Sequence, residues 1–184
     1  MARIPYFDPA TAEGRTKEAF EKLPPLNIFR MMGHSGELLP RFTSLGNHLL
    51  GRADLDPVLR EIAIVRVGVL SKASYEVYQH ERISRQIGMS EELIKAIHEG
   101  PDAAAFDDLQ RLVMRYTDDV VLNVRASDAT FDPLAEHLSH KEMQELTLTI
   151  GYYMMVSRFL ETFDVDIEEK GSTASVDLDA LKKK

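Results

Sequence analysis

Apolar residues recur at helical spacing along most of the chain. From Glu37 to Leu50 they return every three or four residues, which places them on one face of a helix. Two shorter helices are expected before it, over 15–23 and 27–33. No segment shows the alternation of apolar and polar residues that is typical of a half-buried strand. The pattern therefore predicts an all-α protein of a single domain, a helical bundle with no sheet.

Two longer helices are apolar on most sides, and such helices belong in a protein interior. The first begins at Asp56-Pro57, where Asp can cap the helix and Pro fits its first turn, and it stays apolar to Leu70. The second follows Ser139 and Glu142, which fit a capping box. Either both helices fill the core of one monomer, or another subunit covers one of their faces.

Four further helices are expected between these two. They cover residues 74–87, a short stretch that Ser90 caps, residues 104–122 and a short piece that starts at Ser127 or Asp128 and ends at residue 138. Gly88 is placed to end the first of them in the left-handed conformation.

The two ends of the chain differ from its helical part. Residues 1–13 contain two prolines and no periodicity, so we expect an extended arm. Residues 14–168 are predicted to form the helical domain. The tail, residues 169–184, has few large apolar side chains and is expected to be mobile.

Charge and composition exclude several classes of partner. The chain of 184 residues has 30 acidic and 22 basic residues, a net charge of −8, which argues against binding to a phosphate backbone. No apolar run approaches the roughly 18 residues of a membrane span. The first residues lack the apolar core of a signal peptide, so a cytoplasmic location is expected, with no nucleic-acid or membrane partner.

The sequence contains no cysteine. A disulfide scaffold, a thiolate metal site and a cysteine nucleophile are therefore all excluded.

Two titratable residues share a face of the helix over 74–87. Glu76 and His80 are four residues apart, which puts their Cβ atoms about 5–6 Å from each other. A carboxylate one turn from an imidazole orients the ring and favours its charged form, an arrangement suited to general acid–base chemistry. The alternative is an ordinary ion pair on a solvated surface.

Glu61 lies within the apolar helix that begins at Asp56-Pro57, where an unpaired carboxylate is costly. It either reaches solvent at a rim, pairs with Arg60 or Arg66, or lines a pocket. In a pocket, burial shifts the pKa of a carboxyl group toward neutral pH, as general acids and bases require.

Three segments together resemble the signature of the carboxymuconolactone decarboxylase and AhpD-like alkylhydroperoxidase superfamily. That signature has a glutamate on one helix, a Cys-x-x-Cys-x-x-x-His segment in peroxidase members and a Gly-x-Ser-x-Glu segment after it. The matching segments are residues 60–67, 73–80 and 88–92, and the resemblance is strongest over a core motif at 55–98. A helix containing Gly151-Tyr152-Tyr153 resembles the one that packs beside this motif in the superfamily.

The resemblance implies roles for individual residues. Glu61 matches the family's proton-relay glutamate and His80 its histidine. Ala73 and Glu76 stand where peroxidase members have their two cysteines, so peroxide reduction through a sulfenic acid is chemically unavailable. Glu76 also resembles the Glu-x-x-x-His of the decarboxylase members. The expected catalytic set is Glu61, Glu76 and His80.

Two further residues are candidates for substrate binding. Arg52 opens a segment similar to the Arg-Pro-Gly-Leu-Asp of the decarboxylases, where an arginine can hold a substrate carboxylate, although an exposed loop arginine is an equal alternative. Tyr75, the neighbour of Glu76, is the second candidate. The resemblance also implies a homo-oligomer, a trimer or hexamer. We expect neither a cofactor nor a bound metal, since Glu136 and His140 lack the Glu-x-x-His spacing of di-iron bundles.

Three functions remain open. The first is a cofactor-free enzyme that catalyses decarboxylation or proton transfer on an unsaturated lactone or carboxylic acid. The second is a non-catalytic, ligand-binding or structural oligomer on the same scaffold. A relative of the alkylhydroperoxidases that has lost the redox cysteines is the third possibility.

Overall fold

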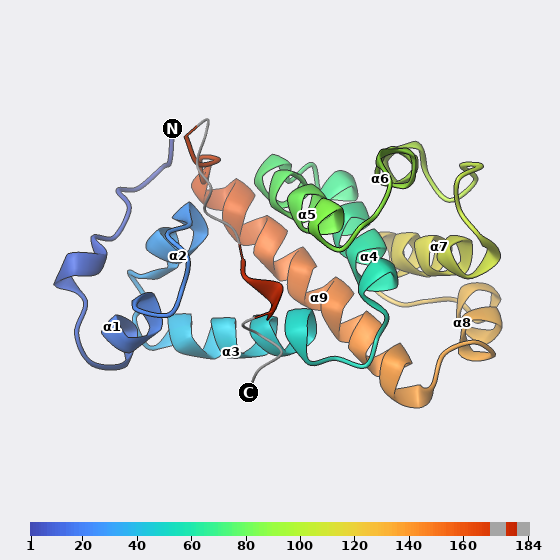
Figure 1. Cartoon of the computed structure of the whole chain (residues 1–184), viewed down its shortest axis with the longest axis horizontal. Helices are drawn as coiled ribbons and strands as arrows, with labels where there is room; N and C mark the ends of the chain where they lie inside the picture. The colour runs from blue at the N-terminus through green and yellow to red at the C-terminus, as the bar shows by residue number, and fades with distance from the viewer. Residues whose placement is uncertain (170–175, 180–184) are drawn as a thin grey trace. The chain divides into compact units, whose positions relative to one another are not determined.

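The structure is a computed structural model, and it describes residues 1–169 and 176–179 (Figure 1). These residues form helices and no strand, which confirms the all-α prediction. The helices are η1 (Pro9–Thr11), α1 (Gly14–Phe20), α2 (Asn27–Met32), α3 (Leu38–Gly51), α4 (Pro57–Leu70), α5 (Ser74–Gln86), α6 (Glu91–Glu99), α7 (Asp108–Asn123), α8 (Asp128–Ala135) and α9 (His140–Phe163). Most of the tail predicted to be mobile, residues 170–175 and 180–184, lies outside the described residues.

Contacts divide the chain into two compact units, Met1–Arg52 with Phe159–Lys184 and Ala53–Arg158. Within the first unit, the predicted N-terminal arm contains the single turn of η1 and is held by a hydrogen bond from the Arg3 N–H to the Phe163 carbonyl, 2.9 Å long. The extent of the functional domain, predicted as residues 14–168, stays a prediction.

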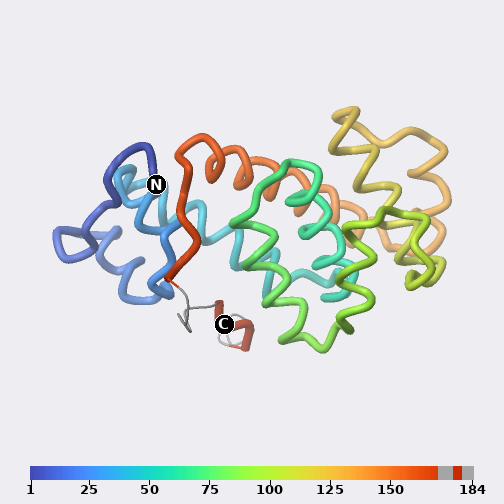
Figure 2. Tube along the Cα trace, turned by 90° about the horizontal axis from the view of Figure 1, so that it is seen from above, coloured from blue at the N-terminus to red at the C-terminus, as the bar shows by residue number. Residues whose placement is uncertain are grey.

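The second unit contains α4 to α8 and most of α9, and α4 contacts α5, α6 and α7 within it (Figures 1 and 2). As predicted, α4 begins at Asp56-Pro57, and the Asp56 carboxylate accepts the N–H groups of Val58 and Leu59. The apolar side chains in the middle of this helix are fully buried, namely Ile62, Ala63, Ile64, Val65 and Val67.

A glycine lets α5 approach α4 closely. A Cβ atom added at Gly68 would lie 2.9 Å from Cγ2 of Val77 and 3.6 Å from Cβ of Glu76. Any larger residue would therefore press against the first turn of α5. At the other end of α5, Gly88 has a φ of 88°, the left-handed conformation predicted for it.

Three helices differ from the prediction by three residues or more at one end, and the first of them, α1, ends at Phe20 rather than at residue 23. α7 begins at Asp108 rather than at residue 104, because Asp107 and Gln110 form a capping box that the sequence analysis missed. α8 ends at Ala135 rather than at residue 138. The predicted box of Ser139 and Glu142 is present at the start of α9.

Within residues 1–169 and 176–179, no helix is both long and apolar enough to cross a membrane.

Candidate active site

A network of charged side chains lies in the interior of the second unit. α4 contributes Arg60 and Glu61, and α5 contributes Glu76 and His80. Burial is nearly complete, since the exposed fraction is 0% for Glu61, 3% for Glu76 and 5% for His80. The three residues expected to form the catalytic set are therefore together, and the pair on α5 is not a solvated surface pair.

Both ring nitrogens of His80 face a carboxylate. Nδ1 lies 2.7 Å from Oε2 of Glu61, and Nε2 lies 3.2 Å from Oε1 of Glu76. The Glu76 contact follows from the four-residue spacing on α5, whereas the Glu61 contact needs α4 and α5 to pack side by side. An imidazole placed between two carboxylates is favoured in its doubly protonated form, in which both nitrogens donate.

Arg60 supplies the second partner of Glu61. Its Nε donates a hydrogen bond to Oε1 of Glu61 over 3.0 Å, and the Arg60 side chain is itself buried. Arg66, the other arginine that the sequence left open, binds Asp118 and the Ile97 carbonyl instead. With His80 protonated, two cations and two anions balance each other, which makes burial of the four groups tolerable.

The surroundings of His80 make it an acid at neutral pH. Burial alone lowers the pKa of His80, but the charge and hydrogen bond of Glu61, followed by those of Glu76, outweigh it and raise the pKa to about 9. The imidazolium form is therefore present at pH 7 and carries a proton that it can donate.

Tyr153 of α9 packs on the ring of His80. The two ring centroids are 4.7 Å apart with the planes at 79°, an edge-to-face contact, and Tyr152 packs on Tyr153 in the same manner at 5.2 Å. Burial, followed by the charge of Glu76, raises the pKa of the Tyr153 hydroxyl well above its ordinary value. Tyr153 was expected only as part of a packing helix, so its contact with His80 is a new feature of the site.

The two candidates for substrate binding are found at the end of α3 and on α5. Arg52 is exposed at the end of α3 and belongs to the first unit. Tyr75 is buried on α5 with 2% of its surface exposed. Their roles stay predictions.

Glu145 is a buried carboxylate that the sequence analysis missed. Its Oε2 accepts the backbone N–H groups of Asp54 and Leu55, at 2.8 and 2.9 Å. These bonds attach α9 to the segment that leads into α4. An acidic residue at a buried position of an apolar helix is the signal that would have revealed it.

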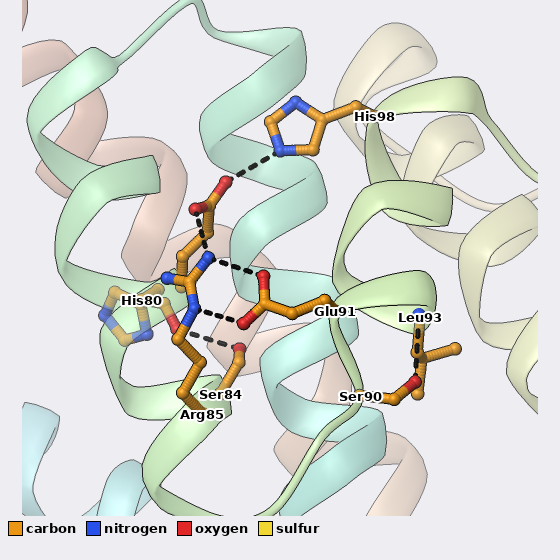
Figure 3. A network of polar contacts seen from close by, with 8 residues as sticks. His80, Ser84, Arg85, Ser90, Glu91, Leu93 and His98 are labelled. Carbon is orange, nitrogen blue, oxygen red and sulfur yellow. Dashed lines mark hydrogen bonds and ion pairs between the residues drawn. The ribbon is translucent and has the colours of Figure 1, made fainter.

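A second polar network lies on the outer side of α5 (Figure 3). Arg85 binds both carboxylate oxygens of Glu91 on α6, and Glu81 accepts from Arg85 and lies 2.9 Å from Nε2 of His98. Within α5, the carbonyl of His80 accepts a hydrogen bond from the Ser84 hydroxyl. These exposed ion pairs connect α5 to α6 and leave the His80 ring to the inner network.

A pocket of about 630 Å³ lies between α8 and α9, away from the His80 network. It is lined by Phe131, Ala135, His140, Met143, Gln144, Thr147 and Leu148. In the part of the chain that the structure describes, no three His, Asp or Glu side chains are grouped closely enough to hold a metal ion.

Comparison with known proteins finds a matching family profile and several structures with the same fold. Residues 36–119 match the profile of the Carboxymuconolactone decarboxylase family. No curated protein matches the chain.

Several solved structures share the fold at low sequence identity. An alkylhydroperoxidase AhpD core, an uncharacterized peroxidase-related protein from Ralstonia eutropha JMP134, has a TM-score of 0.80 and 17% identity, covering 92% of this chain and 93% of that chain. A protein of unknown function from Agrobacterium tumefaciens has a TM-score of 0.71 and 20% identity, covering 76% of this chain and 96% of that chain.

A debrominase in complex with 2,3,4-tribromopyrrole has a TM-score of 0.68 and 17% identity, covering 83% of this chain and 81% of that chain. At such identities the likeness shows the fold alone. The profile match over residues 36–119 and the AhpD-like helical fold agree with the resemblance found in the sequence, and the chain has no cysteine at either position of the peroxidase pair.

Proposed function

We propose that this protein is a cofactor-free acid–base enzyme that acts on an unsaturated lactone or carboxylic acid, with His80 as the proton donor. The observation that carries the proposal is the position of His80 between Glu61 and Glu76, which keeps the ring cationic at neutral pH. A protonated group buried among fixed charges is the equipment of a general acid.

The two nitrogens of His80 have different tasks in this proposal. Nδ1 makes the shorter contact, to Glu61, which Arg60 holds from its other oxygen. The proton on Nε2 makes the longer contact, to Glu76, so it is the one delivered to the substrate. After delivery, Nε2 is an acceptor, and a proton taken up through Glu76 restores the imidazolium.

Decarboxylation fits this arrangement. When CO₂ leaves, the bonding electron pair stays on the substrate and spreads into the conjugated carbonyl as an enolate. His80 then gives its Nε2 proton to carbon, which completes the exchange of CO₂ for a proton. Proton transfer without loss of CO₂ uses the same donor, with Glu61 or Glu76 as the base.

In this proposal the site must open before a substrate can reach His80. Glu61 exposes no surface and His80 exposes 5%, so a substrate reaches Nε2 only when covering side chains move. Movements of this kind accompany substrate binding in many enzymes.

The second candidate is a ligand-binding or structural protein in which the network only stabilises the fold. Its support is the closed, charge-balanced state of the network, together with the separate pocket between α8 and α9. In this case His80 never meets a ligand.

Steady-state assays distinguish the proposed enzyme from the ligand-binding or structural protein. Purified protein is screened with unsaturated lactones and carboxylic acids for CO₂ release and for exchange of carbon-bound hydrogen with deuterated solvent. His80→Ala and Glu61→Gln should each lower kcat/KM by about 10²–10⁴-fold, while His98→Ala, which changes an exposed histidine, should leave it unchanged. Unchanged kcat/KM in both site variants would refute the proposed enzyme.

We also propose that the protein is a homo-oligomer, a trimer or hexamer. α9 presents Leu148 and Met155 to solvent, 58% and 48% exposed, with Gly151 between them on the same side. Exposed apolar residues that share one helix face are typical of an interface.

A further inference from the structure

One side of α9 carries a row of buried polar residues. Glu145, Thr149, Tyr153 and Ser157 follow one another at intervals of four, so each lies about one turn beyond the last, in a row that winds slowly around the helix. Their exposed fractions are 6%, 0%, 3% and 1%. We call these four residues the polar face of α9. Buried polar groups are normally paired, so each member calls for a partner.

Two members of the polar face have partners that fix its place in the unit. Glu145 accepts the backbone N–H groups just before α4, and Tyr153 packs on the ring of His80. The polar face therefore runs from the segment that leads into α4 to the centre of the charged network. Thr149 lies one turn from Glu145 and one turn from Tyr153, between these two points.

The other two members lack a partner. Neither Oγ1 of Thr149 nor Oγ of Ser157 has a hydrogen-bond partner among the described residues, although both atoms are buried. Thr117 on α7 shows the usual arrangement, since it is equally buried and its hydroxyl donates to the Val113 carbonyl over 2.8 Å. A buried hydroxyl without a partner lowers stability, and native proteins contain few.

The two unpaired hydroxyls lie one turn on either side of the tyrosine that touches His80. Eight residues of helix separate them, about 12 Å along the axis, too far apart for one carboxylate to meet both. A small molecule with an oxygen group at each end can meet both, and its centre then lies beside Tyr153.

On the basis of the function proposed above, we infer that the polar face of α9 is the substrate-binding wall of the His80 site. Thr149 Oγ1 donates a hydrogen bond to a carbonyl or carboxylate oxygen at one end of the substrate, and Ser157 Oγ does the same at the other. The substrate class is thus a small unsaturated molecule with oxygen groups at both ends. Thr149 and Ser157 bind the substrate, and His80 supplies the proton.

Equilibrium binding of two matched probes tests this assignment without any turnover. Glutaconate has a carboxylate at each end, and crotonate has one. Isothermal titration should show that glutaconate binds the wild-type protein more tightly than crotonate does. Thr149→Val and Ser157→Ala should each weaken glutaconate binding about tenfold, the usual effect of losing one hydrogen bond to a charged group. Thr117→Val, which removes a buried but paired hydroxyl, should leave the Kd unchanged.

Thermal unfolding of the unliganded proteins gives a second, independent measurement. Thr149→Val removes a hydroxyl that has no partner, so its Tm should equal or exceed that of the wild type. Thr117→Val breaks a hydrogen bond and should lower Tm by roughly 2–4 °C. A drop in Tm of Thr149→Val as large as that of Thr117→Val would show that its hydroxyl is bonded within the fold, which overturns the assignment.

Either of two binding results would also overturn the assignment of the polar face as the substrate-binding wall. One is equal affinity of the wild type and Thr149→Val for glutaconate, and the other is binding of neither probe to the wild type. Failure of the proposed reaction is distinguishable from these. A protein that binds glutaconate through Thr149 but turns over no substrate retains the binding wall and loses the enzymatic role of His80.

Discussion

The carboxylate of Glu145 accepts the backbone N–H of Leu55, 90 residues earlier in the chain, over 2.9 Å. The same oxygen accepts the N–H of Asp54. Two backbone donors that precede a helix are thereby satisfied by one side chain of another helix. The bonds fix the start of α4, and with it Arg60 and Glu61, relative to α9.

Replacing Glu145 by Gln should destabilise the protein. The substitution exchanges a charged acceptor for a neutral one at a buried position, so we expect the free energy of unfolding to fall by about 1–2 kcal/mol. Urea unfolding at pH 7 measures it. Glu161→Gln changes an exposed residue of the same helix and serves as the control. Equal stability of the two variants would contradict the prediction.

The pKa of His80 makes stability depend on pH. Its folded value of about 9 lies above the ordinary value of 6.5, so the protonated ring favours the folded state. This contribution is fully present below pH 6.5 and is lost as the pH rises through 9.

Across that interval the unfolding free energy should fall by about 3 kcal/mol. Chemical denaturation at several pH values measures the slope. His80→Gln keeps a hydrogen-bonding side chain but cannot titrate, and the fall should disappear in it. The same slope in both proteins would show that other groups produce the dependence.

Spacing within one helix predicted the pairing of Glu76 with His80, because residues four apart must share a face. It could not predict the contact between Glu61 and His80, since that depends on how two helices pack. The choice of Arg60 over Arg66 was likewise open, because both flank Glu61 on the same helix. The family resemblance, and not periodicity, placed Glu61 beside His80.

The polar face of α9 was overlooked for a different reason. A count of apolar residues describes that helix as apolar nearly all round, and the four-residue spacing of its polar residues is hidden in such a count. The start of α7 was misplaced because Asp107 and Gln110 were not recognised as a capping box. In both cases the signal is a set of polar residues at fixed spacing. Averaging hydrophobicity over a stretch of sequence removes such a signal.

Gly68→Ala should separate α4 from α5. The added Cβ lies 2.9 Å from Cγ2 of Val77, closer than packed side chains allow, so a shift is required. We expect a loss of about 1–3 kcal/mol in unfolding free energy and lower activity, because Glu61 and His80 lie on the two helices.

Val77→Ala removes the clashing methyl groups, so it tests whether the clash causes the loss of stability in Gly68→Ala. In the double variant the loss from Gly68→Ala should be smaller than in the wild-type background. Additive losses would mean that the glycine is required for another reason.

The oligomeric state depends on the exposed side of α9 in our proposal. Size-exclusion chromatography with light scattering should show a trimer or hexamer for the wild-type protein. Leu148→Glu and Met155→Glu each place a charge in the interface and should yield smaller species. Leu122→Glu changes an equally exposed apolar residue of α7 and should leave the mass unchanged. A monomeric wild-type protein would refute the proposal.

The enclosure of His80 also has a spectroscopic consequence. With both ring nitrogens protonated and each facing a carboxylate, neither N–H is open to bulk water. Hydrogen exchange from the ring should therefore be slow, and ¹⁵N-labelled histidine should give two downfield ring-proton resonances that belong to one residue. Their position and exchange rate would report directly on the opening of the site, before any substrate is known.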